Sequence, residues 1–302
     1  MNYFLLPVRD YNTPNMMSHD CAGSTITLDQ FAIIIGAMKS GTTTLFAMIG
    51  QHPEICPSVI KEVEYFSENQ PQGIHGQGIP IEKYEELWNF NPEQHRFALE
   101  ASTGYSKYPF ESDVPRKIHS YGLQPKFVYI LRNPVDRIES HFKYHAWAIE
   151  NAINSDPCSP FYTEISKYHQ QLSQYMIYFP RSSILILDFD ELCTHPAVLC
   201  QRVWTFLGVR ADFIPDMSPL NQTRMISPQE YHLRQSRWGA LFKFTSLMPG
   251  WVKHAGRSIV SGLFTQNISL TLQQRSQIRT ELSADMQALK TDFGIDVSRW
   301  GF

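Results

Sequence analysis

Four short segments of the chain are continuously apolar rather than alternating between apolar and polar residues. They are residues 31–35, 97–99, 127–131 and 184–187. Such runs are typical of strands that are buried on both faces of a parallel sheet. We therefore expect four parallel strands in the interior of the protein.

The segments between these runs have helical patterns with recognisable ends. Residues 42–49 lead to Gly50 and residues 196–207 lead to Gly208, where glycine commonly ends a helix. Asn133 can cap a helix that has Pro134 in its first turn, and a longer amphipathic segment covers 270–289. The apolar face of the helix after Asn133 would contain Val135, Ile138, Phe142, Ala146 and Ile149. Strands that alternate with helices predict a three-layer α/β fold, with a central parallel sheet and helices on both faces.

The length of 302 residues is compatible with two domains of ordinary size. Two candidate ligand sites, described below, nevertheless lie on strands that must share one sheet. We therefore expect a single domain over residues 1–302, with residues 1–30 as an N-terminal extension. Three loop-rich insertions, 71–96, 151–160 and 211–260, are expected to cover the ligand site, because long loops in compact domains usually carry function.

The charge balance excludes one broad class of partner. With 26 Lys and Arg against 29 Asp and Glu, the net charge is −3, which gives no support to a nucleic-acid binder that neutralises phosphates over a wide face. The five cysteines form no zinc spacing and no C-x-x-C pair, so we expect free thiols in a reducing compartment. A disulfide between Cys193 and Cys200 is the alternative. No signal-peptide pattern and no membrane-length apolar stretch is found, and we expect a cytoplasmic location.

Residues 36–44, GAMKSGTTT, connect the first predicted strand to a helix. A glycine-containing turn of this kind presents free backbone N–H groups and the positive end of the helix dipole. Lys39 adds a positive charge, and further donors come from Ser40, Gly41, Thr42, Thr43 and Thr44. The turn is therefore expected to bind phosphate or sulfate. The alternative is an ordinary Ser/Thr-rich start of a core helix.

The same turn differs from the triphosphate-binding loop G-x-x-x-x-G-K-[ST] at one informative position. Thr42 follows Gly41 where that loop has its lysine, and the lysine of this chain is inside the turn, at Lys39. A kinase needs the lysine on the terminal phosphates and a hydroxyl on Mg²⁺, so we expect a ligand with a shorter phosphate chain and no required metal. A kinase or nucleotidase that uses Mg·ATP is the alternative, and Asp188, at the end of a predicted strand, would then hold the Mg²⁺.

A second anion site is predicted where the strand 127–131 ends. Arg132 lies at the edge of the sheet on which open α/β folds bind ligands, and its planar guanidinium suits a terminal phosphate. Ser140, two turns into the following helix, can bond the same group. The alternative is a structural pairing of Arg132 with Asp136 or Glu139. Together the two sites point to a ligand with separate 5′ and 3′ phosphate groups.

The segments GAMKSGTTTL (36–45) and ILRNPVDRIESHF (130–142) resemble the sulfotransferase family that uses 3′-phosphoadenosine 5′-phosphosulfate (PAPS), which has a P-loop NTPase-like fold. HPEI (52–55), KEVEYF (61–66), EASTGY (100–105) and FLG (206–208) after DEL (190–192) are also similar to motifs of this family. The resemblance covers residues 31–209 and is nearer to the heparan-type and bacterial branches. Two departures are Ala101, where heparan-type enzymes often have lysine, and Thr103, where the family usually has proline.

The resemblance implies roles for the residues of both sites. The first loop would bind the 5′-phosphosulfate, and Arg132 with Ser140 the 3′-phosphate. KHAGR (253–257) is similar to a K-x-x-G-R loop that closes over the 3′-phosphate, which would assign Gly256 and Arg257 to it; an exposed turn is the alternative. Lys39 would stabilise the leaving phosphate, and adenosine 3′,5′-bisphosphate would be the product.

The acceptor must lose a proton, so the resemblance also implies a catalytic base. Glu62 matches the catalytic glutamate of heparan-type relatives, and Lys61 would add positive charge near the transferred group. The alternative is that Glu62 is only the exposed partner of Lys61. Rival candidates for the base are His75, His141 and His145, and Glu100 is a candidate for positioning Lys39 or the acceptor.

We expect the acceptor to be a small molecule with a hydroxyl or amine, such as a bacterial secondary metabolite. The missing lysine at Ala101 argues against a highly anionic glycan, which remains the alternative, as does a nucleotide-binding scaffold without turnover. Trp147 and Trp238 are candidates for the wall of the acceptor site. The sequence leaves the oligomeric state open, a homodimer included.

Overall fold

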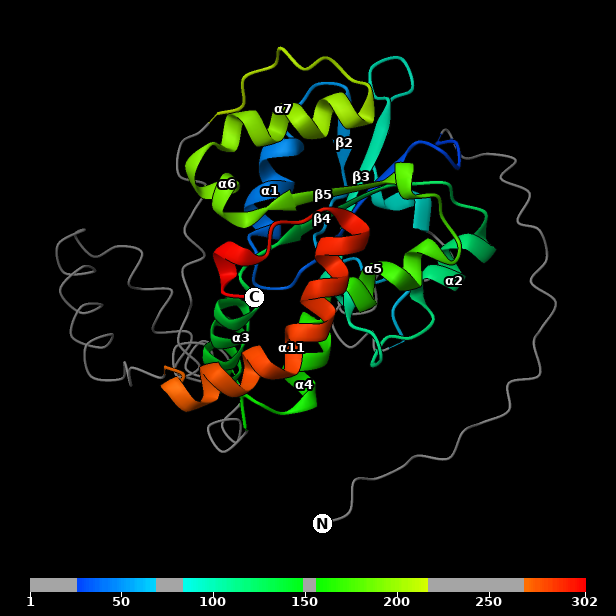
Figure 1. The fold of residues 1–302 in the computed structure, drawn as a ribbon. Coiled ribbons are helices and arrows are strands. Elements are labelled where there is room, and N and C mark those ends of the chain that lie inside the picture. The colour runs from blue at the N-terminus through cyan, green and yellow to red at the C-terminus, as the bar shows by residue number, and fades with distance from the viewer. Residues whose placement is uncertain (1–25, 69–83, 149–155, 217–268) are drawn as a thin grey trace, which may run out of the picture.

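The computed structural model describes residues 26–68, 84–148, 156–216 and 269–302 (Figure 1). Within these residues a sheet of five parallel strands forms the centre, in the order β2-β3-β1-β4-β5. Its strands are β1 (Phe31–Gly36), β2 (Ile55–Pro57), β3 (Phe97–Ala101), β4 (Lys126–Leu131) and β5 (Ile184–Asp188). The predicted α/β fold with a parallel sheet is confirmed.

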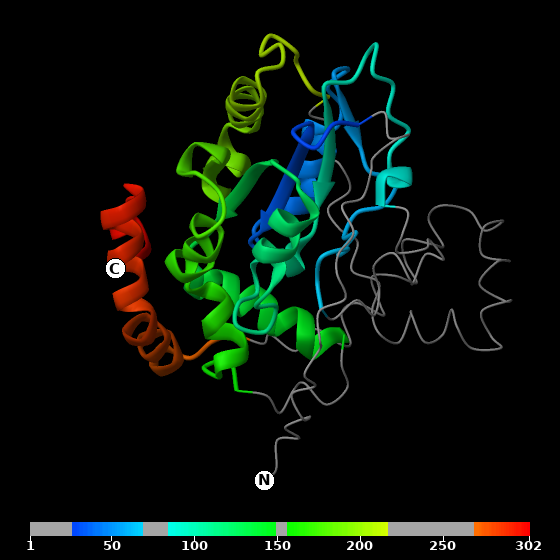
Figure 2. The same cartoon turned by 90° about the vertical axis from the view of Figure 1, so that its right-hand side faces the viewer.

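Helices cover both faces of this sheet, as Figures 1 and 2 show. The α-helices are α1 (Thr42–Ile49), α2 (Val114–Tyr121), α3 (Pro134–Ala148), α4 (Pro160–Thr163), α5 (Tyr168–Met176), α6 (Phe189–Thr194), α7 (Pro196–Leu207) and α11 (Leu272–Phe293). Short 3₁₀ helices are η2 (Tyr84–Leu87), η3 (Thr103–Ser106), η5 (Glu164–Ser166), η6 (Arg181–Ser183) and η8 (Ser298–Trp300). Helices α1, α6 and α7 lie on one side of the sheet, and α2, α3, α5 and α11 lie on the other.

Two apolar clusters explain why the strand sequences are continuously apolar. Ile33 and Ile35 of β1 pack into one cluster with α2, α3, α5 and α11, whereas Ile34 packs into the other with α1 and α7. Successive side chains of a strand point to opposite faces, so a strand covered on both sides must be apolar at every position. The four predicted runs correspond to β1, β3, β4 and β5. The strand β2 was not predicted, because its three residues are too few to show a pattern.

The predicted helix ends agree closely with the structure. Helix α1 ends at Gly50, and α7 ends at Gly208, which has a φ of 76°. Asn133 caps α3, since its Oδ1 accepts a hydrogen bond from the N–H of Val135 at 3.0 Å. Helix α11 is longer than the predicted segment 270–289, because a capping box at Thr271 begins it and a left-handed glycine ends it four residues later than predicted.

One predicted insertion is partly core. In the range 71–96, the side chains of Tyr84, Leu87 and Trp88 are buried and pack with the strands rather than over a site. The ranges 71–83, 151–155 and 217–260 lie outside the described residues, as do the extension 1–25 and Cys21. The four described cysteines are free, and no disulfide joins Cys193 and Cys200.

Two further properties concern the described residues only. None of the helices seen there combines the length and the apolar character that crossing a membrane requires. No group of three or more His, Cys, Asp and Glu side chains in these segments is arranged to hold a metal ion.

Candidate active site

The turn after β1 depends on two glycines that allow close approaches. Gly36 has a φ of 148°, and a Cβ atom there would lie 2.1 Å from Oγ of Ser106. That hydroxyl donates a hydrogen bond of 2.7 Å to the carbonyl of Ile35, so Ser106 is held against the end of the strand. Gly41 has a φ of 84°, which favours glycine. A Cβ on Gly41 would lie 2.8 Å from Cδ2 of Leu192 in α6.

Lys39 occupies the middle of this turn in a strained backbone conformation. Its φ is 69°, in the left-handed region that non-glycine residues rarely adopt and that often marks functional sites. The amine lies 4.4 Å from the centroid of the Tyr144 ring. Burial, together with the positive charges of Arg132 and Arg137, lowers the pKa of Lys39. These cations repel one another, and a bound anion would relieve the repulsion.

The hydroxyls of the turn differ in their surroundings. Ser40 is completely buried, and its Oγ has no hydrogen-bond partner among the described residues. Thr42 is buried, while Thr43 and Thr44 are exposed in the first turn of α1. No hydroxyl caps this helix, because its N-cap residue is Gly41. The alternative of an ordinary Ser/Thr cap is therefore wrong, and a buried hydroxyl without a partner fits a turn that binds an oxyanion.

Arg132, at the end of β4, lies beside the same turn. Its Nη1 donates a hydrogen bond of 3.0 Å to the carbonyl of Lys39, and its guanidinium carbon is 4.7 Å from the centroid of the Phe189 ring. The two predicted anion sites are thus adjacent. Ser140 is half-buried on α3.

The structural alternative for Arg132 is wrong. Arg275 of α11 binds the two carboxylates that this alternative requires. Its Nη1 is 3.0 Å from Oδ1 of Asp136, and its Nη2 contacts Glu139. The guanidinium of Arg132 instead contacts the turn, at the carbonyl of Lys39, and the Phe189 ring.

Arg137 is a charged residue near the site that the sequence analysis missed. It is completely buried, with Nε donating to Oγ of Ser166 at 2.8 Å and Nη2 donating to the carbonyl of Tyr162 at 2.9 Å. Its Nη1 has no hydrogen-bond partner among the described residues. The signal in the sequence was an arginine between the apolar positions Val135 and Ile138. Its charge adds to the positive potential around Lys39.

Lys61 and Glu62 lie at the carboxyl end of β3. The N–H of Glu62 donates to the carbonyl of Ala101 at 2.8 Å, and the two side chains form an ion pair. Oε2 of Glu62 also accepts hydrogen bonds from the N–H of Thr103, at 2.7 Å, and from its hydroxyl, at 2.9 Å. A proline at position 103, which the family resemblance leads one to expect, would have no N–H to give. Burial raises the pKa of Glu62, but the charge of Lys61 and these hydrogen bonds outweigh it, and the pKa is lowered overall.

Glu64 is a second carboxyl group next to Glu62, and no pattern in the sequence singles it out. Its Oε1 accepts a hydrogen bond from the N–H of Gly104 at 2.8 Å, and its Oε2 accepts one from Ser67. Burial is the largest cause that raises the pKa of Glu64, to about 7. Lys39, Glu62 and Glu64 are the non-glycine residues with positive φ in the described chain, so the strained backbone is concentrated at the candidate site.

Three other predicted residues, Glu100, His141 and His145, are engaged in packing and hydrogen bonds within the fold. Glu100 is completely buried and accepts hydrogen bonds from the hydroxyl of Tyr84, at 2.5 Å, and from Oγ of Ser102, at 2.7 Å. The prediction that Glu100 positions Lys39 or the acceptor is therefore wrong. His141 is buried among aromatic rings, and burial strongly lowers its pKa. Burial also lowers the pKa of His145, whose Nδ1 is 3.2 Å from the hydroxyl of Tyr162.

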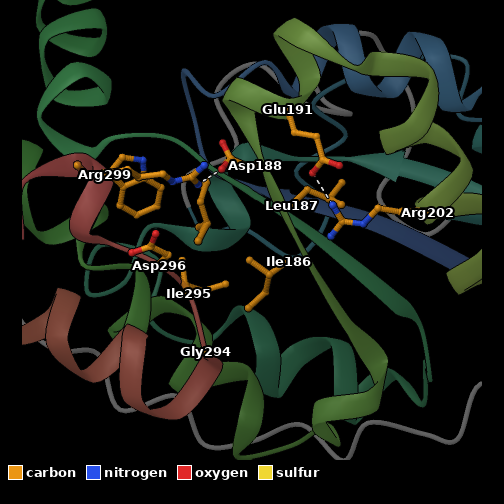
Figure 3. Close-up of a pocket in the computed structure, with 11 residues that line it drawn as sticks. Ile186, Leu187, Asp188, Glu191, Arg202, Gly294, Ile295, Asp296 and Arg299 are labelled. Atoms are coloured by element: carbon orange, nitrogen blue, oxygen red, sulfur yellow. Dashed lines mark hydrogen bonds and ion pairs between the residues drawn. The ribbon is translucent and has the colours of Figure 1, made fainter.

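Asp188, the candidate Mg²⁺ ligand of the kinase alternative, is engaged in other contacts. Its Oδ1 accepts a hydrogen bond from the N–H of Asp190 at 2.7 Å, and its Oδ2 forms an ion pair with Arg299. Figure 3 shows this pair beside the end of β5. Both oxygens are thus used to hold local structure, which weakens the kinase alternative.

Several predicted site residues cannot be placed. His75, Trp238, Gly256 and Arg257 lie outside the described residues, and so does the side chain of Trp147. Their assignments remain predictions.

Comparison with known proteins identifies the family. The bifunctional heparan sulfate N-deacetylase/N-sulfotransferase 2 of Homo sapiens is 26% identical over 206 residues, which cover 59% of this chain and 22% of that protein. The bifunctional heparan sulfate N-deacetylase/N-sulfotransferase 1 of Mus musculus is 30% identical over 210 residues, which cover 61% of this chain and 23% of that protein. The chain thus spans less than a quarter of the length of these relatives.

A solved structure shares the fold. The crystal structure of a sulfotransferase from Alicyclobacillus acidocaldarius superposes with a TM-score of 0.64 at 21% identity, covering 92% of this chain and 100% of that chain. The family model described as a sulfotransferase domain matches residues 29–238. The chain therefore belongs to the sulfotransferase family.

Proposed function

We propose that this sulfotransferase takes the sulfuryl group from PAPS and transfers it to a hydroxyl or amine of its acceptor. The observation that carries the proposal is the geometry of the turn after β1. A strained Lys39 stands next to the buried, unpartnered hydroxyl of Ser40, and Arg132 bonds the backbone of the same turn. This arrangement supports an anion site with two adjacent positively charged parts.

The two parts would hold different groups of one nucleotide. The N–H groups of the turn, Lys39 and the hydroxyls of Ser40, Thr42, Thr43 and Thr44 would bind the 5′ side, where a helix N-terminus and a cation favour negative charge. Arg132 and Ser140 would bind the 3′-phosphate, for which a guanidinium offers two parallel hydrogen bonds. Gly256 and Arg257 are proposed to complete the 3′ side.

PAPS supplies a sulfuryl group on a phosphate that can leave. As the acceptor oxygen or nitrogen bonds to sulfur, the bond from sulfur to the phosphate oxygen breaks, and negative charge grows on that phosphate. Lys39 stabilises this charge from a fixed position, and such preorganised electrostatic stabilisation is usually the largest single contribution to catalysis. In this proposal the positive charge at the leaving phosphate comes from Lys39.

Glu62 is the proposed base that takes the proton of the acceptor. Its lowered pKa keeps it ionised at neutral pH, and hydrogen bonds from Thr103 fix the orientation of the carboxylate. Glu62 does form an ion pair with Lys61, as the alternative interpretation of this residue expects. The pair does not exclude catalysis, because an oriented carboxylate remains an acceptor for a proton.

The acceptor is proposed to be a small molecule. Two carboxyl groups, Glu62 and Glu64, lie side by side at the candidate base, and they disfavour a polyanion there. Contrary to the expectation from the sequence, Ala101 does not bear on the type of acceptor, because this residue is completely buried in the apolar core and its side chain has no access to an acceptor. A glycan is the second candidate, since the human and mouse relatives described above are heparan sulfate N-deacetylase/N-sulfotransferases.

Calorimetry tests the nucleotide part of the proposal. Adenosine 3′,5′-bisphosphate is titrated into the protein in EDTA, and Mg·ATP is titrated in a parallel sample. We expect binding of the bisphosphate without metal and little or no binding of Mg·ATP. Binding of Mg·ATP alone would support the kinase alternative instead.

Transfer of label from ³⁵S-PAPS tests the acceptor part. Phenols, aliphatic alcohols, amines and N-desulfated heparin are offered separately, with Lys39→Ala as the inactive control. Labelling of a small acceptor supports the proposal, and labelling of the heparin alone replaces it by the glycan candidate. A protein that binds the bisphosphate and labels none of the four classes would be a scaffold.

A further inference from the structure

The end of the chain folds back against the carboxyl end of β5. Helix α11 ends at Gly294, whose φ of 69° reverses the chain. Val297 and Trp300 are buried in the core, so apolar packing fixes the segment in place. Figure 3 shows this segment facing β5, and the two line a cavity of about 260 Å³.

Arg299 links this segment to α6 through one carboxylate. Nη2 of Arg299 forms an ion pair with Oδ2 of Asp188, the last residue of β5. Oδ1 of Asp188 accepts the hydrogen bond of the Asp190 N–H and so caps α6. An aspartate in this position commonly stabilises a helix, and here the cationic partner orients it.

Helix α6 in turn touches both candidate phosphate sites. The Phe189 ring lies 3.1 Å from the place of a Cβ on Gly41, and the guanidinium of Arg132 lies over the same ring. Arg132 also donates a hydrogen bond to the carbonyl of Lys39. A displacement of α6 would therefore change the positions of groups in both sites.

We propose that Arg299 is a positioning residue for the nucleotide site: through Asp188 it fixes α6, which holds Phe189 against Arg132 and Gly41. The inference rests on the proposed function, because it presupposes that this site binds the nucleotide. Arg299 also lies over the ring of Trp300, 5.2 Å from its centroid, but its link to α6 is the ion pair with Asp188. The attraction between a cation and an aromatic ring requires the ring to stay close to the cation. The contact of Arg132 with the Phe189 ring therefore depends on the position of α6.

The matched control for this link is the pair of Arg116 and Asp113. Asp113 precedes α2 as Asp188 precedes α6, and its Oδ2 is 2.6 Å from Nη2 of Arg116. The two arginines are similarly exposed, 50% for Arg116 and 42% for Arg299. Helix α2 leads into the amino end of β4, whereas α6 follows the carboxyl end of β5, so the control lies at the opposite edge of the sheet (Figure 1).

The test is the Kd for adenosine 3′,5′-bisphosphate, measured by calorimetry on the full chain. Arg299→Ala is expected to raise this Kd about fivefold, in the range that a partly exposed ion pair can supply. Arg299→Lys, which keeps the charge, should restore it to within about twofold of wild type. Arg116→Ala should leave it unchanged, although both alanine variants lose an ion pair and should lower the melting temperature by similar amounts.

A second background shows whether the effect passes through α6. In the variant Phe189→Leu the ring is gone, so adding Arg299→Ala should change the Kd no further. The inference is overturned if wild type binds the bisphosphate and Arg299→Ala binds it equally well, or if the fivefold effect persists without the ring. Absence of binding by wild type overturns the proposed function and this inference with it.

Discussion

The substitution Glu64→Gln tests the electrostatics of the candidate site. It replaces a half-buried carboxyl by a neutral amide of the same shape. The amide oxygen can still accept the hydrogen bond that the N–H of Gly104 gives to Oε1, and the amide nitrogen can face the hydroxyl of Ser67. The variant therefore keeps the local contacts and removes only the ionisation.

The size and sign of the effect follow from the raised pKa of Glu64. Its rise from the ordinary value of 4.5 to about 7 corresponds to about 3 kcal/mol as an upper limit, which solvent screening reduces because Glu64 is partly exposed. Between these two pH values the folded protein binds more protons at this site than the unfolded chain does. The contribution of Glu64 to stability is therefore greatest below pH 4.5, falls as the pH rises, and is lost above about pH 7.

The assay is urea unfolding of wild type and Glu64→Gln at pH 5 and pH 8. Wild type should lose stability at this site between pH 5 and pH 8, whereas the amide of the variant cannot ionise. The free energy of unfolding of Glu64→Gln minus that of wild type should therefore be about 1–3 kcal/mol larger at pH 8 than at pH 5. Titrating groups away from this site are shared by the two proteins and cancel in this difference, whereas the neighbouring Glu62 interacts with Glu64, so the change reports the titration of the two carboxyl groups together. Glu93→Gln, at an exposed position, is the control and should show no such change. Equal losses of stability in wild type and Glu64→Gln would refute the reasoning.

Three further substitutions probe the turn and the base. Lys39→Ala should reduce sulfuryl transfer by about 10³-fold or more, because a fixed cation at the leaving phosphate is lost; transfer of label from ³⁵S-PAPS measures this, and near-normal rates would contradict the assigned role. Glu62→Gln should lower turnover by about 10²-fold or more while the Kd for adenosine 3′,5′-bisphosphate stays within about twofold of wild type. Full activity of Glu62→Gln on the true acceptor would show that another group is the base. Gly41→Ala should both lower the melting temperature and weaken nucleotide binding, since the new Cβ would meet Leu192 at 2.8 Å and φ is 84°; a variant with unchanged values would mean that the turn adapts at no cost.

The parts of the fold that depend on local sequence could be predicted. A continuous apolar run identifies a buried strand, and Gly50 and Gly208 identify helix ends because each acts within its own turn. The residues of the phosphate-binding turn were found for the same reason, as strand, glycines, lysine and hydroxyls are consecutive.

Contacts between distant segments could not be predicted in this way. Arg132 reaches the carbonyl of Lys39 because β4 pairs with β1, which no local pattern states. Asp136 and Glu139 find Arg275, more than a hundred residues away. Glu64 was missed because its surroundings come from Ser67 and Gly104 together, and its raised pKa arises only when the segments meet.

The most direct test of the account is the preference for a nucleotide that carries a 3′-phosphate. The measurement is the ratio of two Kd values, that of adenosine 5′-phosphate to that of adenosine 3′,5′-bisphosphate, in wild type, Lys39→Ala and Arg132→Ala. Charge-assisted hydrogen bonds to the 3′-phosphate should make the ratio about 10–100 in wild type. Lys39→Ala should weaken both nucleotides and keep the ratio, while Arg132→Ala should lower the ratio by about fivefold or more, with Ser140, Gly256 and Arg257 left to hold the 3′-phosphate. An unchanged ratio in Arg132→Ala would contradict the assignment of two separate phosphate sites.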